Sequence, residues 1–454
     1  MMTTNWIFLA DLGLNSPYGL VIGASVILVL SYFFNLIAAK TNIPSPLLLI
    51  GLGIGAKLGL TYAANQGLIA SDVIPYEDIV LEILGTIGLI FIVLEGALDL
   101  KLSREKWPVI WRSLVIALLS LVLGIAGIAG FFQMVLFDNW SQSIIYAIPL
   151  AVMSSAIVIP SVVGLDEDKK EFMIYESTFS DILGIMMFYM FLSNASVSSA
   201  GAVAGNVFSN IGLTLIFSLL VCYALVYVLQ RINSQVKLFL TVAILALLYV
   251  IGKSFELSSL LMILVFGLML NNHKVFWRSK LTQFIDDKKI KTVLHDFHVL
   301  TLETSFVIRT FFFVIFGMTI TLASLLNLDV AFYSLVVVLV LYVVRLIFLA
   351  FFKRKDIFPL LYIAPRGLIT ILLFFKIPGE APPEWVDESF NEGILLFVII
   401  VTSVVMTISL IQNGLKPNLE MRDDVSELPD SALPENDAPD KLPPADSASS
   451  EQVN

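Results

Sequence analysis

The sequence has few charged residues and few of the residue types that usually build enzyme active sites. Only 14% of its 454 residues are charged, whereas 58% are hydrophobic, and the mean hydropathy is +0.90. The single cysteine, Cys222, excludes an intramolecular disulfide. The chain contains neither a C-x-x-C pair for zinc nor a Walker phosphate loop, so we expect no cofactor and no ATP-driven motor. This composition is typical of polytopic membrane proteins and not of soluble ones.

Histidine is equally scarce. His273, His295 and His298 are the only three, and they lie close together in or near a lysine-rich stretch. They could tune a response to pH, but solvated side chains in a loop are the simpler interpretation. The apolar segments contain no group of residues typical of a metal site or of a catalytic nucleophile with its base. We therefore expect neither an enzyme nor a nucleic-acid partner.

Long apolar runs occupy most of the chain. A helix that crosses a lipid bilayer needs about 20 predominantly apolar residues, each rising about 1.5 Å. With that length as the criterion, the sequence predicts an all-α polytopic membrane protein with about thirteen transmembrane helices. The predicted spans, numbered in order, cover residues 18–38, 44–61, 79–99, 109–132, 143–165, 173–195, 207–229, 236–252, 256–271, 298–323, 329–352, 357–376 and 392–412.

The distribution of lysine and arginine predicts the orientation, because cytoplasmic loops carry an excess of these residues. Of the 27 basic residues, 18 lie in loops after odd-numbered spans and three in loops after even-numbered spans. Three more lie in the C-terminal segment, and three arginines lie within spans. We therefore expect the N-terminus outside and the C-terminus in the cytoplasm, in a protein of the plasma (inner) membrane.

Residues 416–454 differ from the rest of the chain. They contain ten acidic and three basic residues, are rich in Pro, Ser and Ala, and have almost no large apolar side chains. Such a composition cannot bury enough apolar surface to fold, so we predict a disordered acidic cytoplasmic tail. Residues 1–415 form the predicted transmembrane domain.

Five charged side chains lie deep within predicted spans, where an unpaired charge is costly. Asp181 of span 6 lies about 12 Å from the inner boundary, near the midplane, and Glu176 about 5 Å from it. The two acids are five residues apart and diverge by about 140° around a helix, so they cannot share one ligand. We expect Asp181 to face a wet cavity and Glu176 to pair with an arginine, Arg345 fitting best by depth and Arg309 second. The alternative is that these charges, with Arg366, only pair with one another for structure.

Two spans contain residues that interrupt helices. Span 5 has the hydroxyl groups of Ser154 and Ser155 at mid-depth and Pro160 one turn later. Span 12 has Pro365-Arg366-Gly367 at mid-depth. Proline lacks an amide hydrogen and glycine loosens the helix, so backbone groups become free to meet an ion. Interrupted helices at corresponding positions of inverted repeats predict a substrate site between them, with spans 5 and 12 broken and crossing.

These residues resemble the monovalent cation/proton antiporter superfamily, in particular the sodium/hydrogen exchangers with thirteen spans. The resemblance is strongest in the segment from Glu176 to Asp181 (Glu-Ser-Thr-Phe-Ser-Asp), which is similar to the E-S-x-F-N-D motif of that family. Residues 365–367, 43–49 and 94–99 resemble further signatures. The resemblance implies a homodimer in which spans 4–6 and 11–13 form a core bundle and the remaining spans form a scaffold.

The resemblance also implies a role for each deep side chain. Asp181 would bind an alkali cation and a proton in turn, and Glu176 and Arg345 would form a structural ion pair. Arg366 and Arg309 would balance charge at the ends of the crossed helices. The remaining residues that the resemblance implies at or near the cation site are Ser177, Ser180, Glu95, Ser154 and Ser155.

Two departures from the family pattern leave the transported cation open. Ser180 stands where the family usually has Asn, and Ser154-Ser155-Ala156 is closer to the run of the potassium-efflux branch than to the T-D-P triplet of exchangers. We expect a sodium/proton antiporter, with K⁺ or Li⁺ as alternative cations. Exchange is expected to be electroneutral, because a lone carboxylate carries one proton or one cation. The alternatives are a potassium-efflux transporter or channel of the same scaffold and a non-transporting membrane sensor.

Overall fold

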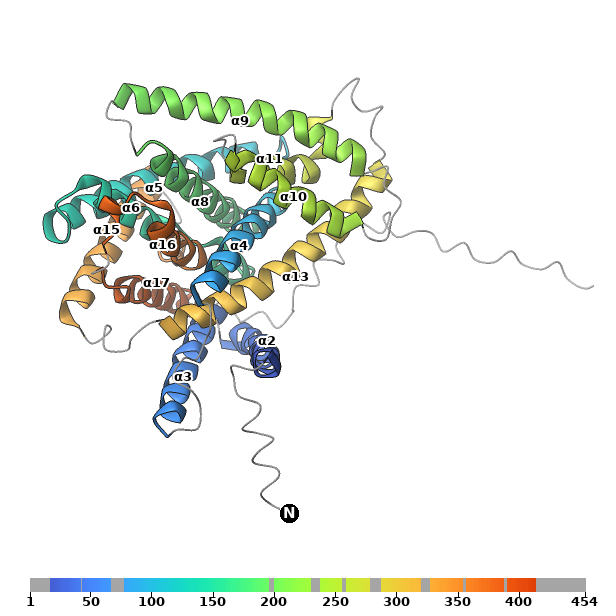
Figure 1. The fold of residues 1–454 in the computed structure, drawn as a ribbon. Coiled ribbons are helices and arrows are strands. Elements are labelled where there is room, and N and C mark those ends of the chain that lie inside the picture. Colours follow the sequence, from blue (N-terminus) through green and yellow to red (C-terminus); the bar gives the residue numbers. More distant parts are fainter. Residues whose placement is uncertain are drawn as a thin grey trace, which may run out of the picture. The chain divides into compact units, whose positions relative to one another are not determined.

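Every regular element of the described chain is a helix. The computed structural model describes residues 17–41, 43–66, 77–195, 200–229, 237–254, 259–277, 287–319, 327–353, 357–387 and 390–413. Helical residues coincide with each of the thirteen predicted spans, which confirms the all-α fold (Figure 1). The tail predicted at residues 416–454 lies outside the described residues.

Fewer described helices are long and apolar enough to cross a membrane than the sequence predicts. Seven stretches of the described chain are long and apolar enough, and three shorter apolar helices lie within α9, α10 and α11. The count of thirteen crossings therefore stays a prediction. The elements are α2 (Pro17–Thr41), α3 (Ser45–Asn65), α4 (Glu77–Asp99), α5 (Trp107–Val135), α6 (Trp140–Ala151), α7 (Ser155–Ser161), α8 (Glu167–Ser193), α9 (Ala200–Leu229), α10 (Lys237–Ser254), α11 (Ser259–Asn271), α12 (His273–Phe276), α13 (Asp287–Thr319), α15 (Leu328–Lys353), α16 (Leu368–Glu380), the 3₁₀ turn η2 (Pro383–Trp385) and α17 (Gly393–Gln412).

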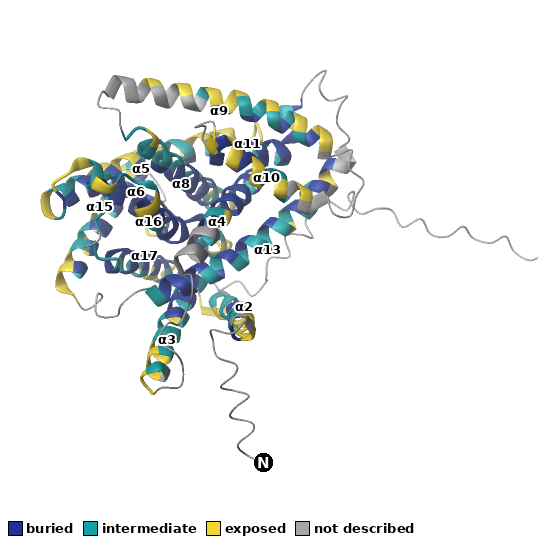
Figure 2. Ribbon diagram, viewed as in Figure 1, coloured by how far each residue is buried: buried dark blue, intermediate teal, exposed yellow. Residues whose placement is uncertain are grey.

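The packing of the helices divides them into two groups that meet along α8 and α16. In the first, which we name the core group, α5 packs against α6, α8 and α15, α7 packs against α8, and α15 packs against α17. In the second, the scaffold group, α4 packs against α11 and α13, and α13 also lies along α3. Helix α16 packs on α6 and α8 and also contacts α4 and α13. Burial is high on α8, α11 and α16, whereas many of the described side chains of α2 and α9 are exposed (Figure 2).

The two predicted helix interruptions are present and meet each other. α6 ends at Ala151 and α7 begins at Ser155, with extended backbone between them. The chain is not helical from Ile357 to Gly367, and only the second half of predicted span 12 forms α16. The amide of Ser154 donates a hydrogen bond to the carbonyl of Pro365 at 2.9 Å. The prediction of two broken, crossing helices is therefore confirmed.

Two helices begin well before the predicted spans. α8 starts at Glu167 and not at residue 173, and α13 starts at Asp287 and not at residue 298. The first turn of α8 carries Glu167 and Asp168, acids that favour the positively polarised N-terminus of a helix. Hydropathy measures the apolar part of a helix only, so it misses charged turns that extend beyond the bilayer.

Candidate functional site

Asp181 lies on α8 beside the break between α6 and α7. Its side chain is buried, and Oδ2 accepts a hydrogen bond from the amide of Ser155 at 3.0 Å. The side chain of Ser155 also interacts with this carboxylate. Oδ1 of Asp181 and the hydroxyl of Ser154 have no hydrogen-bond partner among the residues that the structure describes. The break therefore leaves oxygen atoms available for a proton or a hard cation.

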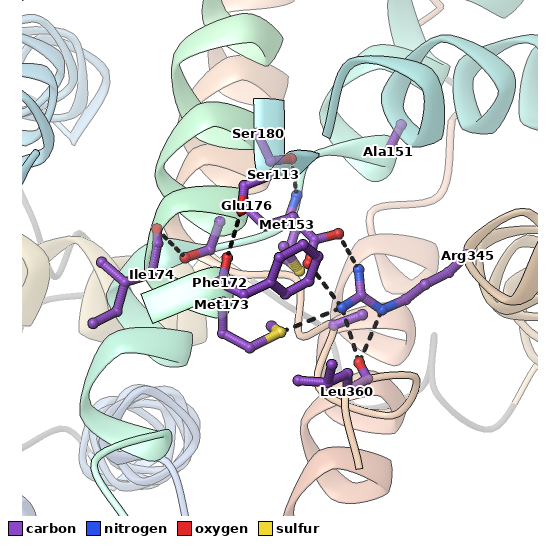
Figure 3. A network of polar contacts seen from close by, with 12 residues as sticks. Ser113, Ala151, Met153, Phe172, Met173, Ile174, Glu176, Ser180, Arg345 and Leu360 are labelled. Carbon is purple, nitrogen blue, oxygen red and sulfur yellow. Dashed lines mark hydrogen bonds and ion pairs between the residues drawn. The ribbon is translucent and has the colours of Figure 1, made fainter. Parts of the chain in front are cut away.

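The extended backbone at the break is held in place by a serine and a glycine. The amide of Met153 donates to Oγ of Ser180 on α8 at 2.9 Å (Figure 3). A Cβ atom on Gly367 would lie 2.7 Å from Cδ1 of Ile157 and 2.9 Å from Oγ of Ser154. Glycine is therefore needed for the second broken segment to approach the first so closely.

Arg366 supplies positive charge to the C-terminus of α6. Its guanidinium donates to the carbonyls of Leu150 and Ala151, each at 3.1 Å, and to the carbonyl of Ala364 at 2.7 Å. Leu150 and Ala151 are the last residues of α6, where carbonyls lack helical donors and carry negative partial charge. The structure thus places Arg366 against one of the helix ends that the break creates.

Glu176 and Arg345 form a bidentate ion pair between α8 and α15. The distances are 2.6 Å from Nη1 to Oε1 and 3.1 Å from Nη2 to Oε2 (Figure 3). Arg345 also donates to the carbonyl of Leu360 from Nε at 3.1 Å and from Nη2 at 2.8 Å. Both charged side chains are buried, at 1% exposure for Glu176 and 4% for Arg345. The pair therefore ties α8, α15 and the irregular chain before α16 together.

Arg309 lies against Glu95 and not beside the crossed helices. Nη1 of Arg309 lies 3.1 Å from Oε1 and 2.9 Å from Oε2 of Glu95, in a contact between α13 and α4. This placement differs from both roles expected for Arg309, as the second-best partner of Glu176 and as a charge at the helix ends. Depth favoured Arg345 over Arg309 as the partner of Glu176, but it says nothing about the direction in which the side chain of Arg309 points. Glu95 nevertheless acts electrostatically on Asp181.

Three further placements were not expected from the sequence. Ser177 donates to the carbonyl of Ile174 on its own helix at 3.2 Å, so only the acceptor side of its hydroxyl is left for a ligand. His273 is buried, and Nε2 of His298 lies 3.2 Å from Oδ1 of Asp99, so the expectation of solvated loop histidines is wrong for these two.

A small cavity adjoins the site on the side of the ion pair. Its volume of about 20 Å³ is enough for one water molecule. The buried hydroxyl of Ser120 lines it and has no hydrogen-bond partner among the described residues. The other polar side chains along its wall are Glu176, Ser180, Arg345 and Arg366.

The arrangement of crossed helices, a buried acid and separate ion pairs can be compared with known proteins. A family model described as the transmembrane sodium/hydrogen exchanger matches residues 25–412. The chain belongs to this family. The exchanger is therefore a multi-pass membrane antiporter of cations and protons and not an enzyme. The resemblance seen in the motifs is confirmed.

Solved structures give the same fold. The exchanger is similar to the sodium proton antiporter MjNhaP1 from Methanocaldococcus jannaschii at pH 8, with 21% identity and a TM-score of 0.66, over 88% of this chain and 98% of that one. An electron-microscopy map of MjNhaP1 gives 20% identity and a TM-score of 0.61, over 88% of this chain and 96% of that one. No curated protein matches the exchanger significantly.

Proposed function

We propose that the exchanger moves Na⁺ against H⁺ by competition for Asp181, one ion for one. The observation that carries this proposal is the buried Oδ1 of Asp181, which no described residue engages, next to the unpartnered hydroxyl of Ser154. Removing a carboxylate from water disfavours its charged form unless another charge neutralises it. Either a proton or a monovalent cation supplies that charge, and the two cannot occupy the same oxygen together.

The remaining residues of the site support this competition in different ways. The amide of Ser155 holds Oδ2, so the carboxylate keeps one orientation while Oδ1 exchanges its occupant. Ser180 fixes the backbone at Met153, and the oxygens of Ser154 and Ser177 complete or approach the cation site. Glu95 adds negative charge nearby while it is paired with Arg309.

The deep arginines are proposed to keep the rest of the site neutral throughout the cycle. Arg345 neutralises Glu176, and Arg366 neutralises the carbonyls at the end of α6. With these charges matched, Asp181 carries one negative charge that one proton or one cation cancels. Exchange is then electroneutral, because each crossing of the loaded site moves no net charge.

We test the function by following a preformed ΔpH across everted membrane vesicles. Adding Na⁺ is expected to dissipate ΔpH in vesicles that contain the exchanger and not in vesicles that lack it. Li⁺ and K⁺ are tested in parallel, and a response to K⁺ alone would favour the potassium-efflux alternative. Clamping the membrane potential with valinomycin and K⁺ should leave the Na⁺-driven rate unchanged. A rate that follows the potential would overturn electroneutral exchange, and no response to any cation would overturn antiport.

Alternating access requires the core group to move against the scaffold group. We assign α16, which packs mainly on α6 and α8, to the core group, and α10, which packs on α11, to the scaffold group. Three contacts then join the two groups at the end of α16 that the proposed orientation places outside. Nζ of Lys253 on α10 lies 3.1 Å from Oε1 of Glu380, and Nζ of Lys376 donates to Oγ1 of Thr86 on α4 at 2.9 Å. The ring of Phe375 packs edge-on against two phenylalanines of α13, Phe312 and Phe316. We propose that these outer contacts open in every cycle.

Cross-linking across the outer contacts should therefore stop exchange. In Lys253→Cys with Glu380→Cys, a short reversible bis-thiol reagent is expected to abolish ΔpH dissipation, and a reductant should restore it. The matched control is Lys106→Cys with Glu171→Cys, an ion pair within the core group between the start of α5 and α8. Cross-linking that pair should leave exchange intact. Full activity of the cross-linked Lys253–Glu380 variant would contradict the proposed movement.

We further propose a homodimer in the plasma (inner) membrane, with the N-terminus outside and the tail of residues 416–454 in the cytoplasm. The excess of basic residues in loops after odd-numbered spans supports this orientation. Only 6% of the apolar stretch Val21–Ala38 in α2 is buried. This surface is therefore available to lipid or to a second copy of the chain. Labelling of an epitope on the tail in intact cells, without permeabilisation, would contradict the orientation. A single-subunit mass in mild detergent would contradict the dimer.

A further inference from the structure

Thr178 carries a buried hydroxyl that the proposed mechanism does not use. The residue is 1% exposed, and its Oγ1 has no hydrogen-bond partner among the described residues. Buried hydroxyls in helices usually donate to the carbonyl four residues earlier, as those of Thr301 and Thr402 do here, each at 2.8 Å. An unsatisfied buried polar group costs about 1–3 kcal/mol, so its position calls for an explanation.

The position of Thr178 separates it from other unpartnered hydroxyls, such as that of Thr310. Thr178 lies three residues before Asp181 on α8, and residues at that spacing lie on the same face with their Cβ atoms about 5–6 Å apart. Its Cγ2 lies 3.1 Å from the place that a Cβ on Gly96 of α4 would occupy. Thr178 is therefore on the face of α8 that carries Asp181 and is in contact with α4.

Glu95 immediately precedes Gly96, and its carboxylate acts electrostatically on Asp181. The side chain of Thr178, through its Cγ2 methyl group, thus lies at the contact between the two helices that carry these acids. The absence of a side chain at Gly96 is what lets the threonine come so close to α4. Neutral hydroxyl oxygens beside a carboxylate are suitable ligands for a hard monovalent cation.

We propose that Oγ1 of Thr178 is a ligand of the cation held at Asp181 and contributes to the affinity for Na⁺. This inference rests on the proposed competition at Asp181. A bound cation would fill the coordination that the hydroxyl lacks within the protein. Because the proton needs only Oδ1, the hydroxyl should matter for the cation half of the cycle and not for the proton half.

The test compares Thr178→Val, which keeps the shape and removes the oxygen, with Thr178→Ser, which keeps the oxygen. In the ΔpH assay, Thr178→Val should raise the KM for Na⁺ about tenfold, the effect of losing about 1.4 kcal/mol, with the maximal rate nearly unchanged. Thr178→Ser should stay close to the wild type. Thr310→Val is the matched control, because it removes another buried, unpartnered hydroxyl, from α13. If Thr178→Val does not fold, Thr178→Ala takes its place.

The outcomes separate this inference from the function on which it rests. A wild-type KM in Thr178→Val, or an equal rise in Thr178→Ser or in Thr310→Val, would overturn the role of the hydroxyl and leave antiport standing. If the wild type itself shows no cation-driven proton flux, the proposed function fails first.

Discussion

Asp181→Asn should reduce cation-driven proton flux to the level of vesicles that lack the exchanger. The amide oxygen of asparagine can still accept the hydrogen bond from Ser155, so the break between α6 and α7 keeps its backbone contact. Asparagine, however, neither binds a proton near neutral pH nor supplies a charge for a cation to neutralise. The ΔpH assay with Na⁺, Li⁺ and K⁺ measures the loss.

The matched control for this variant is Asp166→Asn. Asp166 precedes the same helix but is exposed, in a contact of 3.3 Å with Lys169, so its charge is solvated. We expect Asp166→Asn to exchange ions at the wild-type rate, and both variants to melt close to the wild-type temperature. Substantial flux in Asp181→Asn would remove this residue from the mechanism.

Glu176→Gln should destabilise the protein more than any other single change to the deep charges. The substitution leaves the guanidinium of Arg345 buried without a counter-charge, and breaking a buried ion pair in this way typically costs about 3–5 kcal/mol. Thermal unfolding of the protein in detergent measures the effect. The loss of stability is expected together with a loss of transport.

The double variant Glu176→Leu with Arg345→Met is the control for charge. It removes both charges and fills the site with apolar side chains, so it should recover part of the stability lost in Glu176→Gln. Recovery should be incomplete, because the carbonyl of Leu360 loses the donors that Arg345 provides. A double variant less stable than the single one would show that the pair does more than neutralise charge.

The sequence was sufficient to predict the elements of the site but not all of their partners. Hydropathy located the helices, and the periodicity of a helix placed Asp181 and Glu176 on different faces of α8, where they have different partners. Proline and glycine at residues 365–367, with hydroxyls at Ser154 and Ser155, predicted the two breaks, which the structure contains and joins through one backbone hydrogen bond. These features depend on local chemistry and spacing along one helix.

Contacts between helices far apart in the chain were beyond such reasoning. The pairing of Arg309 with Glu95 depends on how α13 is rotated against α4. The depth of a residue in the membrane does not determine this rotation. The burial of His273 depends on the packing of α12 beside α11, and the contact between His298 and Asp99 depends on the packing of α13 against α4. The sequence likewise did not predict that the hydroxyl of Thr178 lacks a hydrogen-bond partner, because a threonine in an apolar helix is expected to donate to the backbone of its own helix.

Cation binding and proton release by the purified protein test the competition most directly. Adding Na⁺ to the exchanger in weakly buffered detergent solution, at a pH where Asp181 is protonated, should release about one proton for each cation bound, because one charge replaces the other. Asp181→Asn should release none. Cation binding to the wild type without proton release, or equal release from Asp181→Asn, would contradict the account.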